Sequence, residues 1–93
     1  MGPFTLKLSP AATRDLDQLD DKTAGMVLDH LPVLKENPFP RGKLIKKLKG
    51  KKATFYRLRV DKYRAYYTLE GSVVVILRVL SKKDAEKFIK HLG

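Results

Sequence analysis

The stretch that most constrains the fold is residues 54–67, TFYRLRVDKYRAYY. Two runs rich in aromatic and apolar residues flank Asp61-Lys62, which predicts a β-hairpin with Val60 opposite Tyr63. Because side chains alternate between the two faces of a strand, this register separates an apolar face from a cationic one. The apolar face comprises Tyr56, Leu58, Val60, Tyr63, Ala65 and Tyr67, and the cationic face comprises Phe55, Arg57, Arg59, Arg64 and Tyr66.

The remaining elements follow from hydrophobic spacing and from capping residues. Residues 4–8 alternate as a strand, and Ser9-Pro10 opens a helix. A second helix follows the break at Asp20-Asp21, and Pro32 should kink or shorten it. Residues 73–80 are predicted to form a strand. A short amphipathic helix is predicted after it, with Ser81 as its N-cap and Gly93 after its last turn. We therefore predict one α+β domain over residues 1–93, ordered β-α-α-β-β-β-α, in which the helical hairpin packs on one face of a small antiparallel sheet.

Two further parts of this prediction concern the segment before the hairpin and the sheet face on which Arg78 lies. The segment FPRGKLIKKLKGKK, residues 39–52, is expected to be a basic connector between the helices and the hairpin. The face on which Arg78 lies depends on the turn before residues 73–80. A three-residue turn places Arg78 beside Arg64, and a two-residue turn places it on the opposite face, so both arrangements stay open.

The positive charge is concentrated in one segment of the chain. The net charge is +10, and residues 41–64 hold eleven Lys or Arg and a single acid, whereas basic and acidic residues balance in the rest. A localised basic segment predicts a polyanionic partner, most simply nucleic acid. The chain has no cysteine, which excludes disulfides and Cys-based zinc sites and is typical of the reducing cytoplasm. Its longest apolar run, VVVIL, is too short to span a membrane.

The arginines of the hairpin favour a phosphate partner. Arg59 opposite Arg64 is a like-charge pair that destabilises the free sheet, and an arriving anion would relieve the repulsion. The planar guanidinium binds two phosphate oxygens at once, and tyrosines stack on RNA bases. Neither a pair of histidines nor a carboxylate cluster indicates a metal site, so we expect no metal and no cofactor. Cleavage by the 2′-hydroxyl of RNA itself is compatible with such a site, because clustered cations stabilise a phosphorane-like dianion.

The segments LIKKLKG, FYRLRVDKYRAYY and VVVILRV together resemble the RelE/ParE superfamily of toxins from toxin–antitoxin systems. The resemblance covers nearly the whole chain. It implies one of two activities: RelE-like members cleave mRNA in the ribosomal A site without metal, and ParE-like members poison DNA gyrase. In the RelE-like case, Arg57, Arg59 and Arg64 would bind the scissile phosphate, with Arg59 also a candidate for proton transfer. Lys82 would be the general acid, with Lys83 as the alternative.

The resemblance also suggests supporting residues and one departure. Further RNA or phosphate contacts are expected from Lys49, Lys51, Lys52, Tyr66, Arg78 and Lys83. The best-known RelE has a tyrosine in its C-terminal helix that helps to activate the 2′-hydroxyl. Phe88 stands near that place here and cannot move a proton, which makes His91 a candidate for proton transfer.

Three functions remain in competition, and each predicts different partners. A RelE-like toxin would act on the ribosome and mRNA, with an acidic or amphipathic RelB-like antitoxin that covers the basic surface or displaces the last helix. A ParE-like toxin would bind gyrase and cleave no RNA. A plain basic RNA-binding module would bind RNA in a salt-sensitive manner without toxicity. The arginines on the sheet favour the RelE-like toxin.

Overall fold

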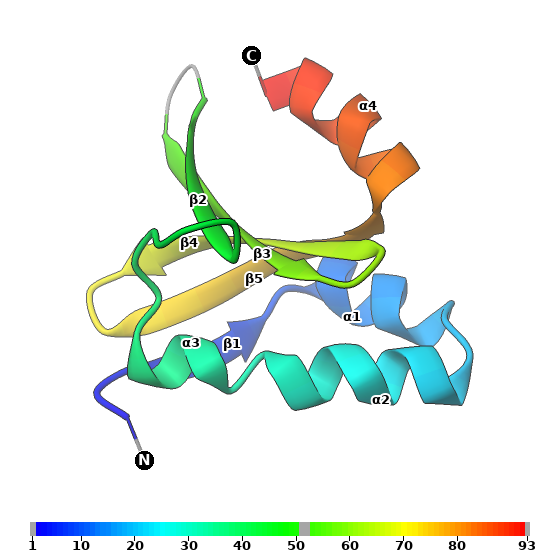
Figure 1. The fold of residues 1–93 in the computed structure, drawn as a ribbon, viewed down its shortest axis with the longest axis horizontal. Coiled ribbons are helices and arrows are strands. Elements are labelled where there is room, and N and C mark those ends of the chain that lie inside the picture. The colour runs from blue at the N-terminus through cyan, green and yellow to red at the C-terminus, as the bar shows by residue number, and fades with distance from the viewer. Residues whose placement is uncertain (1, 51–52, 93) are drawn as a thin grey trace.

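The computed structural model describes residues 2–50 and 53–92, without the side chains of the last two of these. Along the chain, the elements are β1 (Thr5–Leu8), α1 (Pro10–Asp17), α2 (Asp21–His30), α3 (Val33–Glu36), β2 (Ile45–Lys49), β3 (Thr54–Val60), β4 (Tyr63–Glu70), β5 (Val73–Ser81) and α4 (Lys82–Leu92). Figure 1 shows a central sheet with α1, α2 and α3 along one face and α4 on the opposite face. The predicted α+β class and the helical hairpin on one face are confirmed.

The helix boundaries follow from capping residues and from proline. The Ser9 hydroxyl accepts a hydrogen bond from the Ala12 N–H at 3.0 Å, and Pro10 occupies the first turn of α1. The Asp20 carboxylate caps α2 by accepting from the Thr23 N–H at 3.3 Å. The predicted effect of Pro32 is also confirmed, because α2 ends at His30 and the short helix α3 begins after the proline.

The sheet has the strand order β1-β5-β4-β3-β2, and its β3–β4 hairpin has the predicted register. Val60 lies opposite Tyr63, and Arg59 lies opposite Arg64. Asp61 in the turn has a φ of 51°, a left-handed conformation that aspartate tolerates better than most residues. The prediction of a purely antiparallel sheet was wrong for one pair, because β1 runs parallel to β5.

The prediction that residues 39–52 form only a connector was also wrong. Residues 45–49 form β2, which pairs antiparallel with β3 along its whole length. Ile45 and Leu48, the apolar residues of β2, are three positions apart and therefore face opposite sides of the sheet. Ile45 is fully buried in the main core, whereas Leu48 packs beneath α4. This spacing does not show the alternation by which a strand is usually recognised.

A β-bulge settles the position of Arg78. The turn between β4 and β5 is the two-residue Gly71-Ser72, and Glu70 lies opposite Val73. The register then shifts between Tyr66 and Tyr67, so that Tyr66 lies opposite Arg78 and Arg64 lies opposite Leu80. The turn therefore has two residues, which alone would have placed Arg78 away from Arg64. The bulge reverses this and puts Arg78 on the same face of the sheet as Arg64.

The interior consists of two unequal apolar clusters. The main core lies between the sheet and helices α1 to α3, and its buried residues are Ala12, Leu16, Val27, Leu31, Leu34, Ile45, Leu58, Val60, Ala65, Tyr67, Val74, Ile76 and Val79. The second cluster lies between the sheet and α4, and comprises Tyr66, Leu80 and Ala85 with Leu48 and Phe88 against them. Within the described ranges, no helix has the length and apolar character that crossing a bilayer requires.

The hydroxyl of Tyr67 makes a buried contact with a measurable pH dependence. It donates to the Pro38 carbonyl oxygen at 2.6 Å, and burial raises the pKa of Tyr67. We expect Tyr67→Phe to lower the free energy of unfolding at neutral pH by about 1–2 kcal/mol, since a buried carbonyl loses its partner. The raised pKa makes the folded protein hold this proton more tightly than the unfolded chain, so stability should fall as pH rises above about 10.

Urea denaturation at neutral pH and at about pH 10.5 measures both effects. Tyr56→Phe is the matched control, because Tyr56 stacks on Tyr67 with ring centroids 5.4 Å apart but lies only partly buried. The alkaline loss should be smaller in Tyr67→Phe than in the wild type and unchanged in Tyr56→Phe. Equal alkaline losses in all three proteins would show that Tyr67 is not responsible.

Candidate active site

The site is built on the sheet face that carries α4. Cross-strand pairing places Arg57 and Tyr66 opposite each other, and Arg59 and Arg64 opposite each other, all four on this face. Lys46 of β2 lies opposite Arg57 and therefore joins the same face. Sequence reasoning missed Lys46 because its segment was interpreted as a connector. The strand and its faces become evident only in the structure, where Ile45 beside it is buried in the main core.

A basic pocket lies where the β3–β4 turn meets the start of α4. Its volume is about 480 Å³, and its lining residues are Arg59, Asp61, Lys62, Arg64, Ser81, Lys82 and Lys83. The Lys82 N–H donates to the Lys62 carbonyl oxygen at 3.0 Å, which fixes the turn against the first residue of the helix. The structure thus brings together Arg59, Arg64 and Lys82, three of the four predicted catalytic residues, with Lys83 beside them.

Arg64 is oriented by the turn that precedes it. Its Nη1 donates to the carbonyl oxygens of Asp61 and Tyr63, both at 2.9 Å. Among the residues that the structure describes, no acceptor is recorded for its Nε or Nη2. Arg64 is therefore held in place through one nitrogen, while its other donors remain available to an anion.

Arg57 lies beside the basic pocket rather than in its lining. Its Nη2 donates to the Lys43 carbonyl oxygen at 3.3 Å, and its buried Nε has no partner within the described part of the chain. Burial lowers the pKa of Arg57, and the positive charges of Arg64 and Arg59 lower it further. The lowered pKa of Arg57 thus reflects its burial first, and second the like charges that share the face predicted from the hairpin pattern.

Tyr66 lies under α4 instead of on the surface. The residue is 1% exposed, and its ring packs against Phe88 with centroids 5.0 Å apart. Burial raises the pKa of the Tyr66 hydroxyl, and the nearby cations of Arg57 and Arg64 oppose that change. In this arrangement no face of the ring is open to an RNA base. Phe88 serves here as the apolar contact that seats α4 on the sheet.

Arg78 is engaged in an internal ion pair. Its Nε and Nη2 donate to the two carboxylate oxygens of Asp15 at 2.8 and 3.0 Å, and the Val79 N–H donates to the same carboxylate at 2.9 Å. The hydrogen bond to Asp15 is the main cause of the raised pKa of Arg78. The structure therefore separates Arg78 from the basic pocket and ties it to α1.

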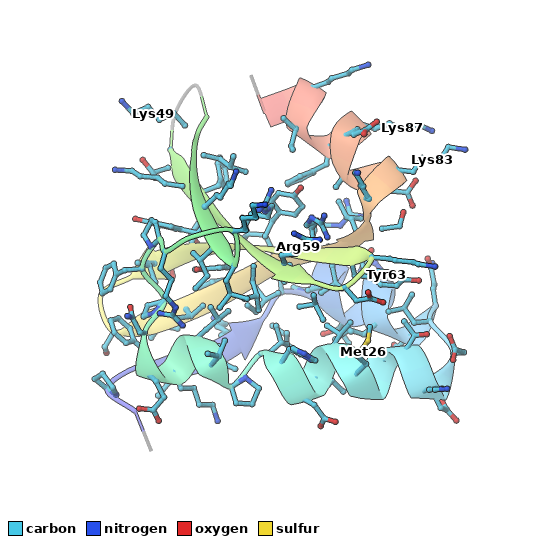
Figure 2. All side chains as sticks on the ribbon, in the orientation of Figure 1. Met26, Lys49, Arg59, Tyr63, Lys83 and Lys87 are labelled. Carbon is cyan, nitrogen blue, oxygen red and sulfur yellow. The ribbon has the colours of Figure 1, made fainter. Side chains whose placement is uncertain are left out.

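The other predicted residues are dispersed. Lys49 ends β2 and is exposed, and Figure 2 shows it at the upper left of the view, away from Lys83 and Lys87 of α4 at the right. Lys51, Lys52 and the side chain of His91 lie outside the described residues. Among the described side chains, those of residues 2–50 and 53–90, no three from His, Asp or Glu lie close enough together to hold a metal ion.

Comparison with known proteins connects this geometry to a family. A family model described as the ParE toxin of the type II toxin–antitoxin system parDE matches residues 6–86. The chain is 30% identical over 83 residues to the candidate toxin RelE1 of Methanocaldococcus jannaschii, and the match covers 87% of this chain and 91% of that protein.

Solved structures agree with the sequence relatives. The RelE–RelB complex of Pyrococcus horikoshii contains a chain that is 25% identical, with a TM-score of 0.71 over 86% of this chain and 96% of that one. The RelBE2 toxin–antitoxin complex of Mycobacterium tuberculosis gives 28% identity and a TM-score of 0.73, over 86% and 99% of the two chains. The chain therefore belongs to the ParE toxin family of type II toxin–antitoxin systems, within the RelE/ParE superfamily that its motifs resemble.

Proposed function

We propose that this chain is the toxin of a toxin–antitoxin pair and inhibits translation by cleaving mRNA in the ribosomal A site. The basic pocket is the observation that carries the proposal. Five cationic side chains and one carboxylate line a hollow of about 480 Å³, and two of the cations are arginines on opposed strands. Such a site suits a phosphodiester whose negative charge increases in the transition state.

The chemistry is an attack by the 2′-hydroxyl on the adjacent phosphorus. The bond from the 2′ oxygen to phosphorus forms, the bond to the 5′ oxygen breaks, and a 2′,3′-cyclic phosphate remains. Arg59 and Arg64 stabilise the dianionic transition state, and Arg57 adds positive charge from beside the pocket. Lys82 protonates the leaving 5′ oxygen, with Lys83 as the alternative acid.

The proton of the 2′-hydroxyl requires an acceptor. Phe88 offers none, and its ring is occupied by the contact with Tyr66. His91 is the candidate from the sequence, because Arg59, the other residue named for proton transfer, remains protonated and cannot accept a proton. The structure adds Asp61, the carboxylate among the described residues that line the basic pocket. Its turn position, where its carbonyl oxygen accepts from Arg64, makes it a second candidate for the base.

The proposed partners follow from the family and from the charge. Two structural relatives are toxin–antitoxin complexes, RelE–RelB and RelBE2. A RelB-like antitoxin with acidic or amphipathic segments would complement the basic pocket and the cationic face. The ribosome would supply the mRNA and position its A-site codon.

A ParE-like action on DNA gyrase is the second candidate, favoured by the description of the matching family model. The two functions give opposite results with purified components. Ribosomes programmed with a short mRNA, and the same mRNA free in solution, are each incubated with the chain, and 5′ ends are mapped by primer extension. A parallel reaction measures supercoiling by gyrase. Cuts confined to the ribosome-bound mRNA support the mRNA-cleaving toxin, whereas inhibited supercoiling with intact mRNA supports the gyrase poison.

A further inference from the structure

Lys46 extends the cationic face to the edge of the sheet. β2 is an edge strand, and Lys46 lies opposite Arg57 in its pairing with β3. Directly opposed residues of an antiparallel pair project from the same face. The neighbours of Lys46 agree, since Ile45 is buried in the main core on the other face and Leu48 packs beneath α4. The exposed ammonium of Lys46 is therefore on the same face as Arg57, Arg59 and Arg64.

The charges at this position have no internal compensation in the described chain. The ion pair recorded among those residues is Arg78–Asp15, which lies on β5 and α1. Arg57 has a buried Nε without a partner and a long 3.3 Å contact from Nη2, although a guanidinium group carries five donors. Lys46 adds a like charge directly across from it, which destabilises the free protein. An anion bound between the two side chains would relieve the repulsion.

The backbone positions of these cations are spread both along and across the strands. Arg57 is two residues from Arg59 along β3, a backbone distance of about 7 Å. Lys46 is on the neighbouring strand β2, about 5 Å from Arg57 across the strands. The cations therefore run from Arg64 in the basic pocket, through Arg59 and Arg57, to Lys46 at the sheet edge. A series of cations at such intervals matches successive phosphates of one extended strand.

We propose that Lys46 and Arg57 form a second phosphate subsite, which holds a neighbouring phosphate of the same RNA strand whose scissile phosphate occupies the basic pocket. The RNA then crosses the strands from β4 over β3 to β2. This subsite deepens the proposed mRNA-cleaving function and depends on it for the identity of the ligand. It assigns a binding role to Lys46, outside the residues predicted from the sequence.

The chain supplies a matched control at the next position. Lys46 and Lys47 are both exposed, carry the same charge and lie in the same strand, but Lys47 lies opposite Tyr56 and so projects from the other face. The test is binding of a short, fluorescent, 2′-O-methyl RNA, which cannot be cleaved, measured by anisotropy at several salt concentrations. The proteins are the wild type, Lys46→Ala, Lys46→Arg and Lys47→Ala.

Lys46→Ala should weaken binding about fivefold and make the slope of log affinity against log salt shallower by about 0.7. Lys46→Arg should bind like the wild type, and Lys47→Ala should change affinity by less than about twofold. Equal losses in Lys46→Ala and Lys47→Ala, an unchanged Lys46→Ala, or a wild type that binds no RNA would each overturn the subsite. The mapping of mRNA cuts on ribosomes is a separate measurement: cuts together with an unchanged Lys46→Ala would overturn the subsite alone, whereas intact mRNA would overturn the proposed function.

Discussion

Replacing Arg64 with alanine is expected to reduce ribosome-dependent mRNA cleavage by about 100-fold or more, because removal of one preorganised donor to a developing oxyanion typically costs that much. Arg64 lines the basic pocket, and the carbonyl oxygens of Asp61 and Tyr63 hold its Nη1 in place. The effect should appear in the maximal single-turnover rate at saturating ribosome complex, since the contact strengthens in the transition state.

Stability separates this catalytic effect from unfolding. The two carbonyl groups that Arg64 contacts are near the surface and can bind water instead, so the Tm of Arg64→Ala should fall by only a few degrees. Arg14→Ala removes the same charge from the exposed surface of α1 and should cleave like the wild type. Full cleavage by Arg64→Ala, or an equal loss in Arg14→Ala, would contradict the assigned role. Arg64→Lys should restore only part of the rate, because an ammonium group lacks the planar pair of donors.

Replacing Asp15 with alanine is expected to lower the free energy of unfolding by about 2–3 kcal/mol. Asp15 is the point at which α1 is fastened to β5, through both oxygens to Arg78 and through one to the Val79 N–H. The side chain of Asp15 is only 12% exposed. The donors that lose their acceptor in Asp15→Ala, on Arg78 and Val79, are therefore poorly placed to bind water instead. Arg78 is 37% exposed and recovers part of its solvation, which keeps the expected loss below that of a fully buried pair.

Asp17→Ala is the control for this change. Asp17 is two positions further along α1, exposed, and carries the same charge. Urea denaturation should therefore show a large loss for Asp15→Ala and almost none for Asp17→Ala. Asp15→Asn should fall between them, since it keeps an acceptor for the Val79 N–H but loses the charge. Similar midpoints for Asp15→Ala and the wild type would show that the contact does not stabilise the fold.

The sequence predicted the hairpin register because two independent signals agreed there. Aromatic and apolar residues alternate with arginines on both sides of Asp61-Lys62, so only one register buries Leu58, Val60, Ala65 and Tyr67 together. The same alternation placed Arg57, Arg59 and Arg64 on one face before any tertiary contact was known. The joining of Lys82 to that face depends on the hydrogen bond from its N–H to Lys62, a contact between segments far apart in the chain.

Other features depended on contacts that a linear pattern does not contain. The bulge that moves Arg78 to the face of Tyr66 is accompanied by a hydrogen bond from the Ser9 hydroxyl to the Leu77 carbonyl oxygen, at 2.8 Å. The ion pair between Arg78 and Asp15 requires that α1 lie along β5. β2 was missed because Ile45 and Leu48 bury on opposite faces, each against a different cluster. For the same reason, the sequence pattern did not show that Lys46, at the proposed second subsite, lies on the cationic face.

The central claim is that the basic pocket directs a 2′-hydroxyl to attack its own phosphodiester on the ribosome. The most direct test uses two mRNAs that differ by one oxygen, with the A-site nucleotide at the mapped cut carrying either ribose or 2′-deoxyribose. The purified chain should cut the ribose message on ribosomes, leave a 2′,3′-cyclic phosphate and leave the deoxy message intact. Equal cutting of both messages would contradict the chemistry, and intact messages together with inhibited gyrase supercoiling would contradict the function itself.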